Sequence, residues 1–350
     1  MSSECIINKR SIASGKSVYI IAELSANHHQ DFRQAVDLIH AAKSSGADAV
    51  KLQTYTPDTI TIDCDNDYFK IGKGTIWDGK TLYSLYRDAY TPWEWQPELK
   101  RIAQSLGMDL FSSPFDFSSV DFLETLDVPA YKIASFEIVD IPLIRKIAST
   151  GKPILLSTGM ATLSEIDDAI QTIRDVGNEN IALLKCTSAY PATPEDMHLR
   201  TIPHMEELFN VPVGISDHTL GIAVPVAAVA LGASIVEKHF TMSRKIAGPD
   251  SAFSLEPHEF RAMADAIRDT EKALGRVNYS VTENETASMV FRRSLFAVKD
   301  ISMGDILTPE NIRSIRPGYG LHPKYYEKIL GKRAATDICR GTPLSWDYIQ

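Results

Sequence analysis

Two histidines follow short apolar segments whose residue types suit β-strands. His218 ends the run VGISDH that starts at residue 213, and His239 ends the run IVEKH that starts at residue 235. Residues 220–231, rich in Ala and Val, have the composition of a connecting helix. Parallel strands joined by a helix bring their carboxyl ends side by side, about 5 Å apart. The two imidazoles therefore predict a divalent metal site, and a separate structural role for each histidine is the alternative.

The same rhythm of a short apolar strand and a helix runs through most of the chain. Eight strands are predicted, and several are the continuous apolar runs expected of a parallel sheet buried on both faces. They lie at residues 18–24, 47–54, 108–113, 130–135, 153–158, 181–187, 211–216 and 234–240. Eight such units over roughly 255 residues predict an α/β fold, a (β/α)8 TIM barrel. An open doubly wound sheet is the alternative, but no GxGxxG sequence follows the first strand.

The chain departs from this rhythm at two places. About forty residues after the second strand are irregular and rich in Trp, Tyr and Gly, which is typical of a binding loop. After a long helix predicted at residues 256–274, turn sequences recur at short spacing. We therefore expect a barrel domain over residues 1–276, a polar linker over residues 277–290 and a small β-rich domain over residues 291–350.

The composition restricts the class of protein and its partners. With 44% hydrophobic and 23% charged residues, the chain has the composition of a soluble globular protein. A net charge of −9 argues against nucleic acid as a partner. Four well-separated cysteines indicate reduced thiols in a cytoplasmic protein. Neither a signal peptide nor an apolar run of membrane-spanning length is recognisable, so no membrane partner is expected.

Chemically capable side chains gather where the predicted strands end, which is where a barrel of this kind binds its substrate. Alternation along a strand puts Glu23 on one face with Ile21, and Lys51 on one face with Gln53. A charge flanked by buried aliphatic residues must point into the barrel and be paired or liganded. The polar residues at the strand ends are Glu23, Asn27, His28, Lys51, Gln53, Ser112, Ser113, Lys132, Ser135, Glu137, Ser157, Thr158, Lys185, Thr187, Ser188, Ser216, His218, Glu237 and His239.

These residue types together suggest a reaction class. Buried ammonium and hydroxyl groups suit a small phosphorylated or carboxylated anion. Glu23 and Glu137 can act as acid or base, and two histidines leave coordination positions of a metal open for substrate. We therefore expect a metal-assisted enzyme acting on a small anion. A buried ion-pair network without chemistry is the alternative, which the cost of burying so many charges disfavours.

Motifs spread over nearly the whole chain, from about Val18 to Trp346, resemble the sialic acid synthase family. They are IAELSANH, AVKLQT, YKIASFE, LSTGM, KCTSAYP, GISDHT, EKHFT, GPD and IRPGYGL. The resemblance implies a barrel joined to an antifreeze-like (SAF) domain, and a homodimer in which each C-terminal domain covers the partner's barrel. It also implies a transferase that condenses phosphoenolpyruvate with an amino-sugar aldehyde and releases phosphate by C–O cleavage, giving a nine-carbon α-keto acid.

The resemblance implies a role for each site residue as well. Mn²⁺ or Mg²⁺ would bind His218 and His239, and Glu23 would act on water as general base. Phosphoenolpyruvate would be held by Lys51, Lys132, Ser113, Ser135, Ser157 and Ser216. The sugar would meet Glu137, Gln53, Asp250 and the partner chain's copy of Arg316. Lys185 and Ser188 complete the expected substrate-binding residues, although N-acetylneuraminate-type members carry Asn in a CTN motif where Ser188 stands.

Two segments indicate which amino sugar the resemblance implies as the substrate. Residues 74–95 and 248–253 most resemble members whose substrate is 2,4-diacetamido-2,4,6-trideoxy-L-altrose. Trp77, Ala252 and Phe253 would suit its C6 methyl group, and packing within the loops is the alternative. Members that form N-acetylneuraminate or legionaminate are the nearest alternatives. A metal-dependent pyruvate aldolase and a non-catalytic sugar-binding protein are the other function classes.

Overall fold

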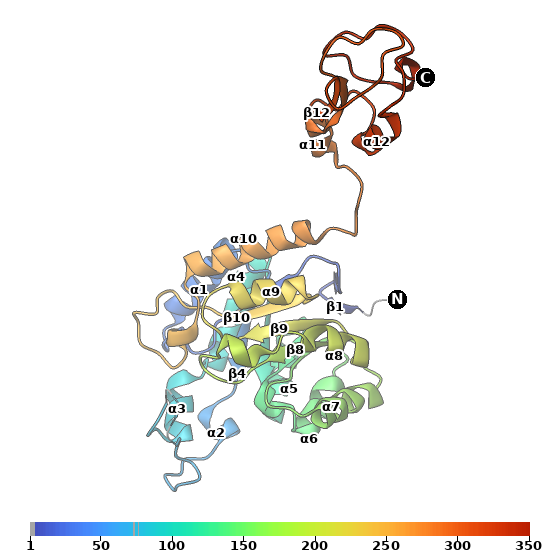
Figure 1. Cartoon of the computed structure of the whole chain (residues 1–350). Coiled ribbons are helices and arrows are strands. Elements are labelled where there is room, and N and C mark those ends of the chain that lie inside the picture. Colours follow the sequence, from blue (N-terminus) through green and yellow to red (C-terminus); the bar gives the residue numbers. More distant parts are fainter. Residues whose placement is uncertain (1–3, 73, 76) are drawn as a thin grey trace. The chain divides into compact units, whose positions relative to one another are not determined.

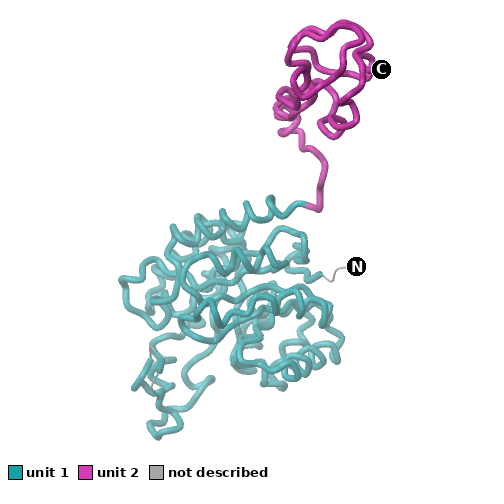
Figure 2. The backbone as a smooth tube through the Cα atoms, viewed as in Figure 1, with its two compact units in different colours: residues 1–275 teal, residues 276–350 magenta. Residues whose placement is uncertain are grey.

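The structure is a computed structural model that describes residues 4–72, 74–75 and 77–350. It divides into two compact units, residues 1–275 and residues 276–350 (Figure 2). The segment predicted as a linker, residues 277–290, contains the one-turn helix α11 (Glu283–Thr286). No helix of the described residues is long and apolar enough to cross a membrane.

Eight parallel strands of the first unit form a closed barrel in the order β10-β3-β4-β5-β6-β7-β8-β9 (Figure 1). The barrel closes because β10, its last strand, pairs with β3, its first, with Ile235 opposite Tyr19. Each strand overlaps a segment predicted from the sequence, so the predicted (β/α)8 barrel is confirmed. The strands are β3 (Tyr19–Glu23), β4 (Ala49–Thr54), β5 (Asp109–Pro114), β6 (Tyr131–Ile133), β7 (Ile154–Ser157), β8 (Ile181–Cys186), β9 (Val213–Asp217) and β10 (Ile235–His239).

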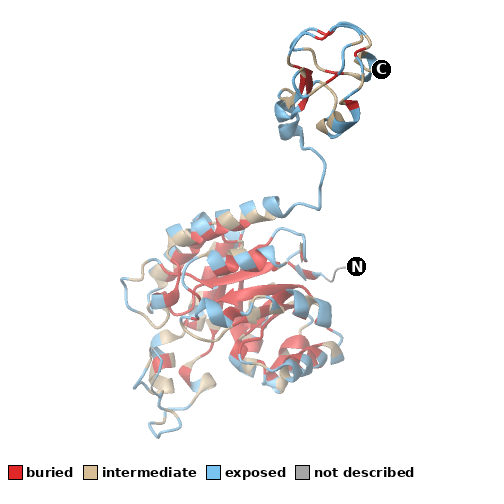
Figure 3. Ribbon diagram, viewed as in Figure 1, coloured by how far each residue is buried: buried red, intermediate tan, exposed pale blue. Residues whose placement is uncertain are grey.

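Helices surround the barrel and bury one side against it (Figure 3). In α1 the buried residues Ala35, Leu38, Ile39 and Ala42 recur at helical spacing. The Asp31 carboxylate accepts hydrogen bonds from the first turn of that helix, as an N-cap does. The helices are α1 (Phe32–Ser44), α4 (Gln96–Ser105), α5 (Phe117–Thr125), α6 (Ile141–Ala148), α7 (Leu163–Asp175), α8 (Thr201–Phe209), α9 (Ala223–Ala230) and α10 (Pro257–Leu274).

The first unit also contains short elements outside the barrel strands and their helices. An N-terminal hairpin that the sequence reading did not predict, β1 (Cys5–Ile7) and β2 (Arg10–Ile12), adds buried residues to the barrel core. The aromatic insertion after β4 is more regular than expected. It includes α2 (Pro57–Ile60), α3 (Leu82–Ala89) and the 3₁₀ turn η1 (Trp93–Trp95). Its residues 73 and 76 lie outside the described ranges. Further 3₁₀ turns are η2 (Ser135–Glu137), η3 (Pro194–Met197) and η4 (Ser251–Phe253).

The second unit is built around a small core of its own. Strands β11 (Ser294–Ala297) and β12 (Ile312–Ile315) pair antiparallel, and isolated bridges such as Ile301 with Ile338 take the place of a continuous sheet. The shorter elements are η5 (Ala287–Phe291), η6 (Pro323–Tyr325), α12 (Tyr326–Ile329) and η7 (Trp346–Tyr348). The buried core residues are Leu295, Ala297, Ile301, Leu307, Ile312, Ile329, Ala334, Ile338 and Leu344.

Candidate active site

Polar side chains point into the barrel near the carboxyl ends of its strands. The register pairs Glu23 of β3 with Lys51 of β4, and Gln53 with Ser113 of β5. Every residue of β3 is buried, because helices cover its outer face and side chains fill its inner face. Charged groups at these positions are therefore removed from water and depend on one another.

Lys51 is the centre of the buried charge cluster. Its ammonium lies 2.9 Å from Glu23 Oε2 and 3.7 Å from Glu237 Oε1, and it donates to Ser113 Oγ at 3.4 Å. Burial raises the pKa of Glu23 to about 7, with the Glu237 carboxylate adding to the rise and Lys51 opposing it. Burial alone would lower the pKa of Lys51, but the two carboxylates raise it above its ordinary value. Glu23 is thereby brought into the range where a carboxylate exchanges protons near neutral pH.

Lys132 of β6 is a fully buried ammonium with neutral partners. Its Nζ donates to Ser157 Oγ at 2.6 Å and to the carbonyl oxygen of Ile133 at 2.9 Å. It takes part in none of the salt bridges among the described residues, and burial lowers its pKa. An ammonium held only by a hydroxyl and a carbonyl can accept an anionic partner.

A hydrogen-bonded chain extends from the charge cluster to the loop after β10. Gln53 Nε2 donates to Glu23 Oε1 at 2.9 Å and to Ser25 Oγ at 3.0 Å. Ser25 Oγ in turn donates to the carboxylate of Asp250. Burial raises the pKa of Asp250, while its Ser25 hydrogen bond opposes the rise. The structure thus links Gln53 and Asp250, both predicted for the sugar, and the predicted base Glu23 through Ser25, a serine that was not predicted.

The two imidazoles face each other, with ring centroids 5.3 Å apart. His218 Nδ1 lies 3.0 Å from the carbonyl oxygen of Thr187, which can only accept, so neutral His218 carries its proton on Nδ1. Nε2 is then free to act as a ligand. His239 Nδ1 is buried without a hydrogen-bond partner. The pair fits a divalent ion between the rings, with a backbone carbonyl orienting one ligand as in known metal sites.

The protein supplies only part of a coordination sphere. Within the described residues, no group of three or more His, Cys, Asp or Glu side chains is arranged to hold a metal ion. An ion held by two imidazoles alone would keep several positions for water and substrate, which is the arrangement of catalytic rather than structural metal sites.

An aromatic wall stands beside the imidazoles. Tyr190 packs on His218 with ring centroids 4.4 Å apart, and Phe253 packs on His239 at 4.9 Å. Trp77, from the insertion after β4, lies 5.7 Å from the Tyr190 ring and donates from Nε1 to the carbonyl oxygen of Pro249 at 3.0 Å. Phe253 is buried, whereas Ala252 is exposed. The wall forms an apolar surface next to the candidate metal position.

The loops after β6, β7 and β8 bring Ser135 and Ser188 together beside Gly159. A Cβ on Gly159 would lie 2.2 Å from Ser188 Oγ and 2.7 Å from Ser135 Oγ, so only glycine permits this approach. The Gly159 amide donates to Ser135 Oγ at 3.2 Å.

Glu137 Oε2 is buried without a hydrogen-bond partner, and burial raises the pKa of Glu137 to about 7. Ser216 donates to Glu237 Oε1 at 2.9 Å.

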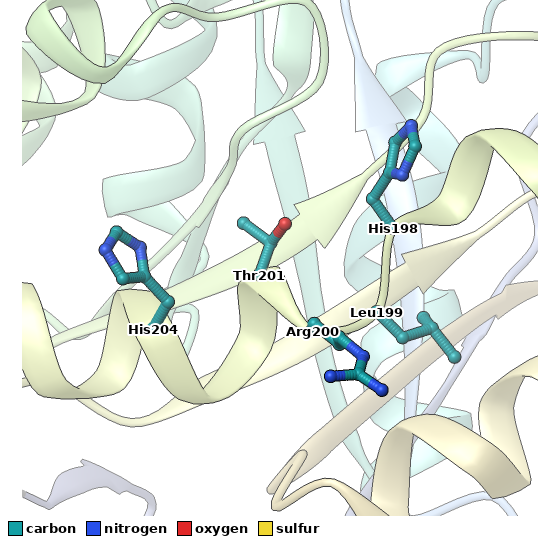
Figure 4. A pocket seen from close by; sticks show the side chains of 5 residues that line it. All are labelled: His198, Leu199, Arg200, Thr201 and His204. Carbon is teal, nitrogen blue, oxygen red and sulfur yellow. The ribbon is translucent and has the colours of Figure 1, made fainter.

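One predicted site residue of the barrel, Lys185, is not brought to this cluster. Lys185 is opposite Ile215 in the strand register and Cys186 is opposite Ser216, so Lys185 is on the outer face of β8. Its Nζ donates to the carbonyl oxygen of Cys186 at 2.8 Å, and it lines a cavity of about 380 Å³ with Ser188, Ile166 of α7 and Met205 of α8. Arg316 belongs to the second unit, where it is exposed directly after β12, and its role in the partner's site stays a prediction. A second cavity of about 530 Å³ at the start of α8 contains none of the predicted residues (Figure 4); it is lined by His198, Leu199, Arg200, Thr201 and His204.

Glu237 was predicted as a polar strand-end residue without a role, and it shares the inner face of β10 with His239. The site also contains three residues that were not predicted from the sequence. Cys186 Sγ lies 3.9 Å from His218 Nδ1, and alternation against Lys185 could have found it once the inner face was known. Ser25 and Tyr190 stand in loops, where no periodic signal exists.

Comparison with known proteins shows what this chain is similar to. The NeuB family model matches residues 38–279, and the SAF domain model matches residues 292–350. The pseudaminic acid synthase of Helicobacter pylori is 49% identical over 335 residues, covering 95% of this chain and 97% of that protein. The N,N'-diacetyllegionaminic acid synthase of Legionella pneumophila is 37% identical over 342 residues, covering 96% of each. The solved structure of a Bacillus subtilis spore coat polysaccharide biosynthesis protein aligns with a TM-score of 0.68 at 34% identity, covering 99% of each chain.

Proposed function

Because the chain belongs to the NeuB family, we propose that it is an enzyme that condenses phosphoenolpyruvate with 2,4-diacetamido-2,4,6-trideoxy-L-altrose to give pseudaminic acid and phosphate. The identity of 49% to a pseudaminic acid synthase, against 37% to a legionaminic acid synthase, favours this sugar over the legionaminate alternative. N-acetylneuraminate is the other alternative sugar product.

The observation that supports the reaction most is a pair of buried ammonium groups beside a pair of imidazoles. Lys51 and Lys132 are almost completely buried, and Ser113 and Ser157 are their hydroxyl partners. Phosphoenolpyruvate carries a carboxylate and a phosphate on the same carbon, and two fixed cations with hydroxyl donors match that charge distribution. Ser135 and Ser216 are proposed to complete the phosphoenolpyruvate site, and Ser188 lies beside Ser135.

We propose that Mn²⁺ or Mg²⁺ binds His218 and His239. When bound, the ion would supply Lewis-acid polarisation of the sugar aldehyde. Asp250, Gln53 and Glu137 are proposed to orient the sugar, and the apolar wall of Tyr190, Phe253 and Trp77 suits the C6 methyl group of a 6-deoxy sugar.

In the proposed reaction the methylene carbon of phosphoenolpyruvate forms a bond to the aldehyde carbon, whose oxygen becomes a hydroxyl. Positive charge then develops on the adjacent carbon, where water adds and loses a proton. Glu23 is proposed to take that proton, because its pKa of about 7 suits a base at neutral pH. The tetrahedral intermediate then breaks its C–O bond and releases phosphate, which takes the proton of the remaining hydroxyl as that oxygen becomes the keto group. The proton that Glu23 takes from water balances the proton that the sugar oxygen gains. Lys51 and Lys132 stabilise the anionic groups throughout.

We further propose a homodimer in which the SAF domain covers the partner's barrel. Large apolar side chains are exposed just after the barrel strands, among them Phe136 at 58%, Met160 at 62% and Leu220 at 61%. The second unit exposes apolar side chains of its own, including Tyr319 near Arg316. Such surfaces are typical of protein interfaces.

The shared site can be tested by subunit mixing. Arg316→Ala should raise the KM for the sugar, and Lys51→Ala should abolish turnover. After both chains are mixed and re-equilibrated, random pairing would restore about a quarter of the sites. No recovery in a sample with verified heterodimers would contradict the arrangement.

A substrate panel tests the proposed reaction. Phosphate release should require both phosphoenolpyruvate and the amino sugar, and mass spectrometry should detect pseudaminic acid as the product. A pyruvate aldolase would release no phosphate, and a non-catalytic sugar-binding protein would form no product. Preferential turnover of N-acetylmannosamine or of the legionaminate precursor would shift the assignment within the family. The free thiols of its four cysteines support a cytoplasmic location for the reaction.

A further inference from the structure

A second buried charge cluster lies on the outer face of β9 and β10, behind the two imidazoles. Asp217 and Lys238 are opposite each other in the strand register, and Lys238 Nζ lies 2.5 Å from Asp217 Oδ2. Both side chains are 0% exposed. His218 and His239 are the next residues in each chain segment, and strand alternation sends them to the inner face. The ion pair is thus one residue from each candidate metal ligand.

The same ion pair fixes the backbone on both sides of His218. The Asp217 carboxylate accepts hydrogen bonds from the amide of Thr219 at 2.9 Å and from its hydroxyl at 3.1 Å. Lys238 Nζ donates to the carbonyl oxygen of Thr219. One connected network therefore holds the residues that flank His218 and the residue that precedes His239.

Stability alone does not explain a charged pair at this place. Removing two charges from water costs about as much as their attraction returns, and apolar residues of similar volume often stabilise a protein as well or better. The other outward positions of these strands, Val213, Ile215 and Val236, are buried aliphatic residues. The ion pair instead orients the backbone, because its hydrogen bonds fix the position of Thr219.

We propose that Asp217, Lys238 and Thr219 are positioning residues that set the separation and orientation of the His218 and His239 rings, and so the affinity for a divalent ion. This proposal rests on the proposed function, which assigns the ion to these histidines. On the inner face, the bond from Ser216 to Glu237 ties the same two strands one residue earlier. The strands are therefore linked on both faces directly before the imidazoles.

The test replaces the ion pair with apolar residues and measures metal binding. In Asp217→Leu/Lys238→Met the full chain should remain folded, and its Kd for Mn²⁺ alone, read by electron paramagnetic resonance, should rise about 10–100-fold. Excess Mn²⁺ should restore kcat. A matched control is Asp48→Asn, whose partners Arg10 and Arg268 lie at the opposite end of the barrel strands at 2.7 and 3.0 Å. Its Kd for Mn²⁺ should equal that of the unaltered chain.

A milder variant decides the matter if the double variant does not fold. Thr219→Val keeps the ion pair and removes one hydrogen bond from Asp217, so the Kd for Mn²⁺ should rise about threefold. A folded double variant with unchanged Kd would overturn the proposal, as would an unchanged Kd in Thr219→Val where the double variant is unfolded. Failure of the unaltered chain to bind Mn²⁺ would instead overturn the metal assignment of the proposed function, and this proposal with it.

Discussion

The two faces of the same barrel strands carry buried charges in contrasting states. On the outer face of β9 and β10, the side chains of Asp217 and Lys238 are bonded to each other and to Thr219. On the inner face, Glu237 Oε2 and His239 Nδ1 are buried without a hydrogen-bond partner. Glu23 Oε2 lies 2.9 Å from Lys51 Nζ but makes no directed hydrogen bond.

This difference separates groups that hold the fold from groups that await a ligand. A buried polar atom without a partner costs free energy, and four of the six such atoms among the described residues, those of Glu23, Glu137, Glu237 and His239, lie at the strand ends where a substrate or metal is proposed to bind. In the outer pair, by contrast, neither Asp217 nor Lys238 has a buried polar atom left without a partner. Burial by itself therefore does not distinguish a binding site from a structural ion pair. The two differ in whether their buried polar atoms already have hydrogen-bond partners.

The largest effect is expected at Lys132 on the inner face. Lys132→Met should lower kcat/KM for phosphoenolpyruvate about 10³-fold, because a buried cation that stabilises the anionic substrate is lost. The free energy of unfolding should not fall, since the direct hydrogen-bond partners of the ammonium are neutral and burial lowers its pKa despite the attraction of Glu237. Steady-state kinetics and urea denaturation measure both quantities. Lys152→Met, which alters a partly exposed lysine paired with Glu124 and Asp127, is the matched control and should keep full activity.

The corresponding change on the outer face should affect stability first. Lys238→Met alone leaves the Asp217 carboxylate buried and unpaired, which should lower the free energy of unfolding by about 3–5 kcal/mol. Urea denaturation of this variant beside Lys132→Met gives a direct ranking of the two faces. If the free energy of unfolding falls less in Lys238→Met than in Lys132→Met, the proposed difference between the two faces is wrong.

A smaller effect is expected from the pH dependence of Glu137. Burial raises its pKa in the folded chain to about 7, so the proton is bound more tightly in the folded state than in the unfolded state. The resulting stabilisation is complete below the unfolded pKa and is lost as the pH rises through about 7. Relative to the unaltered chain, Glu137→Gln should therefore gain about 1–2 kcal/mol at high pH, a value reduced for its partial exposure.

This pH effect is measured by denaturation of both chains in mildly acidic and mildly alkaline buffers. The two stability curves should converge on the acidic side and separate on the alkaline side. Curves that run parallel across the range would show that Glu137 is not desolvated as described.

The smallest effect is expected at Lys185. Because its ammonium faces α7 and α8, Lys185→Met should change kcat/KM for phosphoenolpyruvate by less than about threefold, as a substitution outside the site does. A loss close to that of Lys132→Met would instead support the substrate-binding role predicted from the sequence and would place both faces of β8 in the site.

The sequence was sufficient for the architecture and for most of the inner face. Continuous apolar runs at regular spacing predicted the eight strands, and polar residues at their ends predicted where a site would form. The positions of Glu23, Lys51, Gln53, Lys132, His218 and His239 at one end of the barrel agree with that reading. The unpredicted hairpin of β1 and β2 has strands too short for a period of two to be visible.

The proximity of the two histidines could be predicted from the sequence. His218 and His239 each end a strand, adjacent strands in a barrel must lie side by side, and their ring centroids are 5.3 Å apart. Strand order and side-chain alternation are properties of the chain itself, so this proximity followed from the sequence.

Tertiary structure alone decided which face each polar residue occupies in β8 and what lies behind the histidines. Side chains alternate along a strand, but both faces of a barrel strand are buried, so periodicity does not say which phase points inward. Lys185 and Cys186 are neighbours, and only packing against α7 and α8 sends the lysine outward.

The ion pair of Asp217 with Lys238 joins residues of two different strands, and the bond of Ser25 to Asp250 joins two loops. Contacts of that kind depend on three-dimensional closure, which no local pattern records.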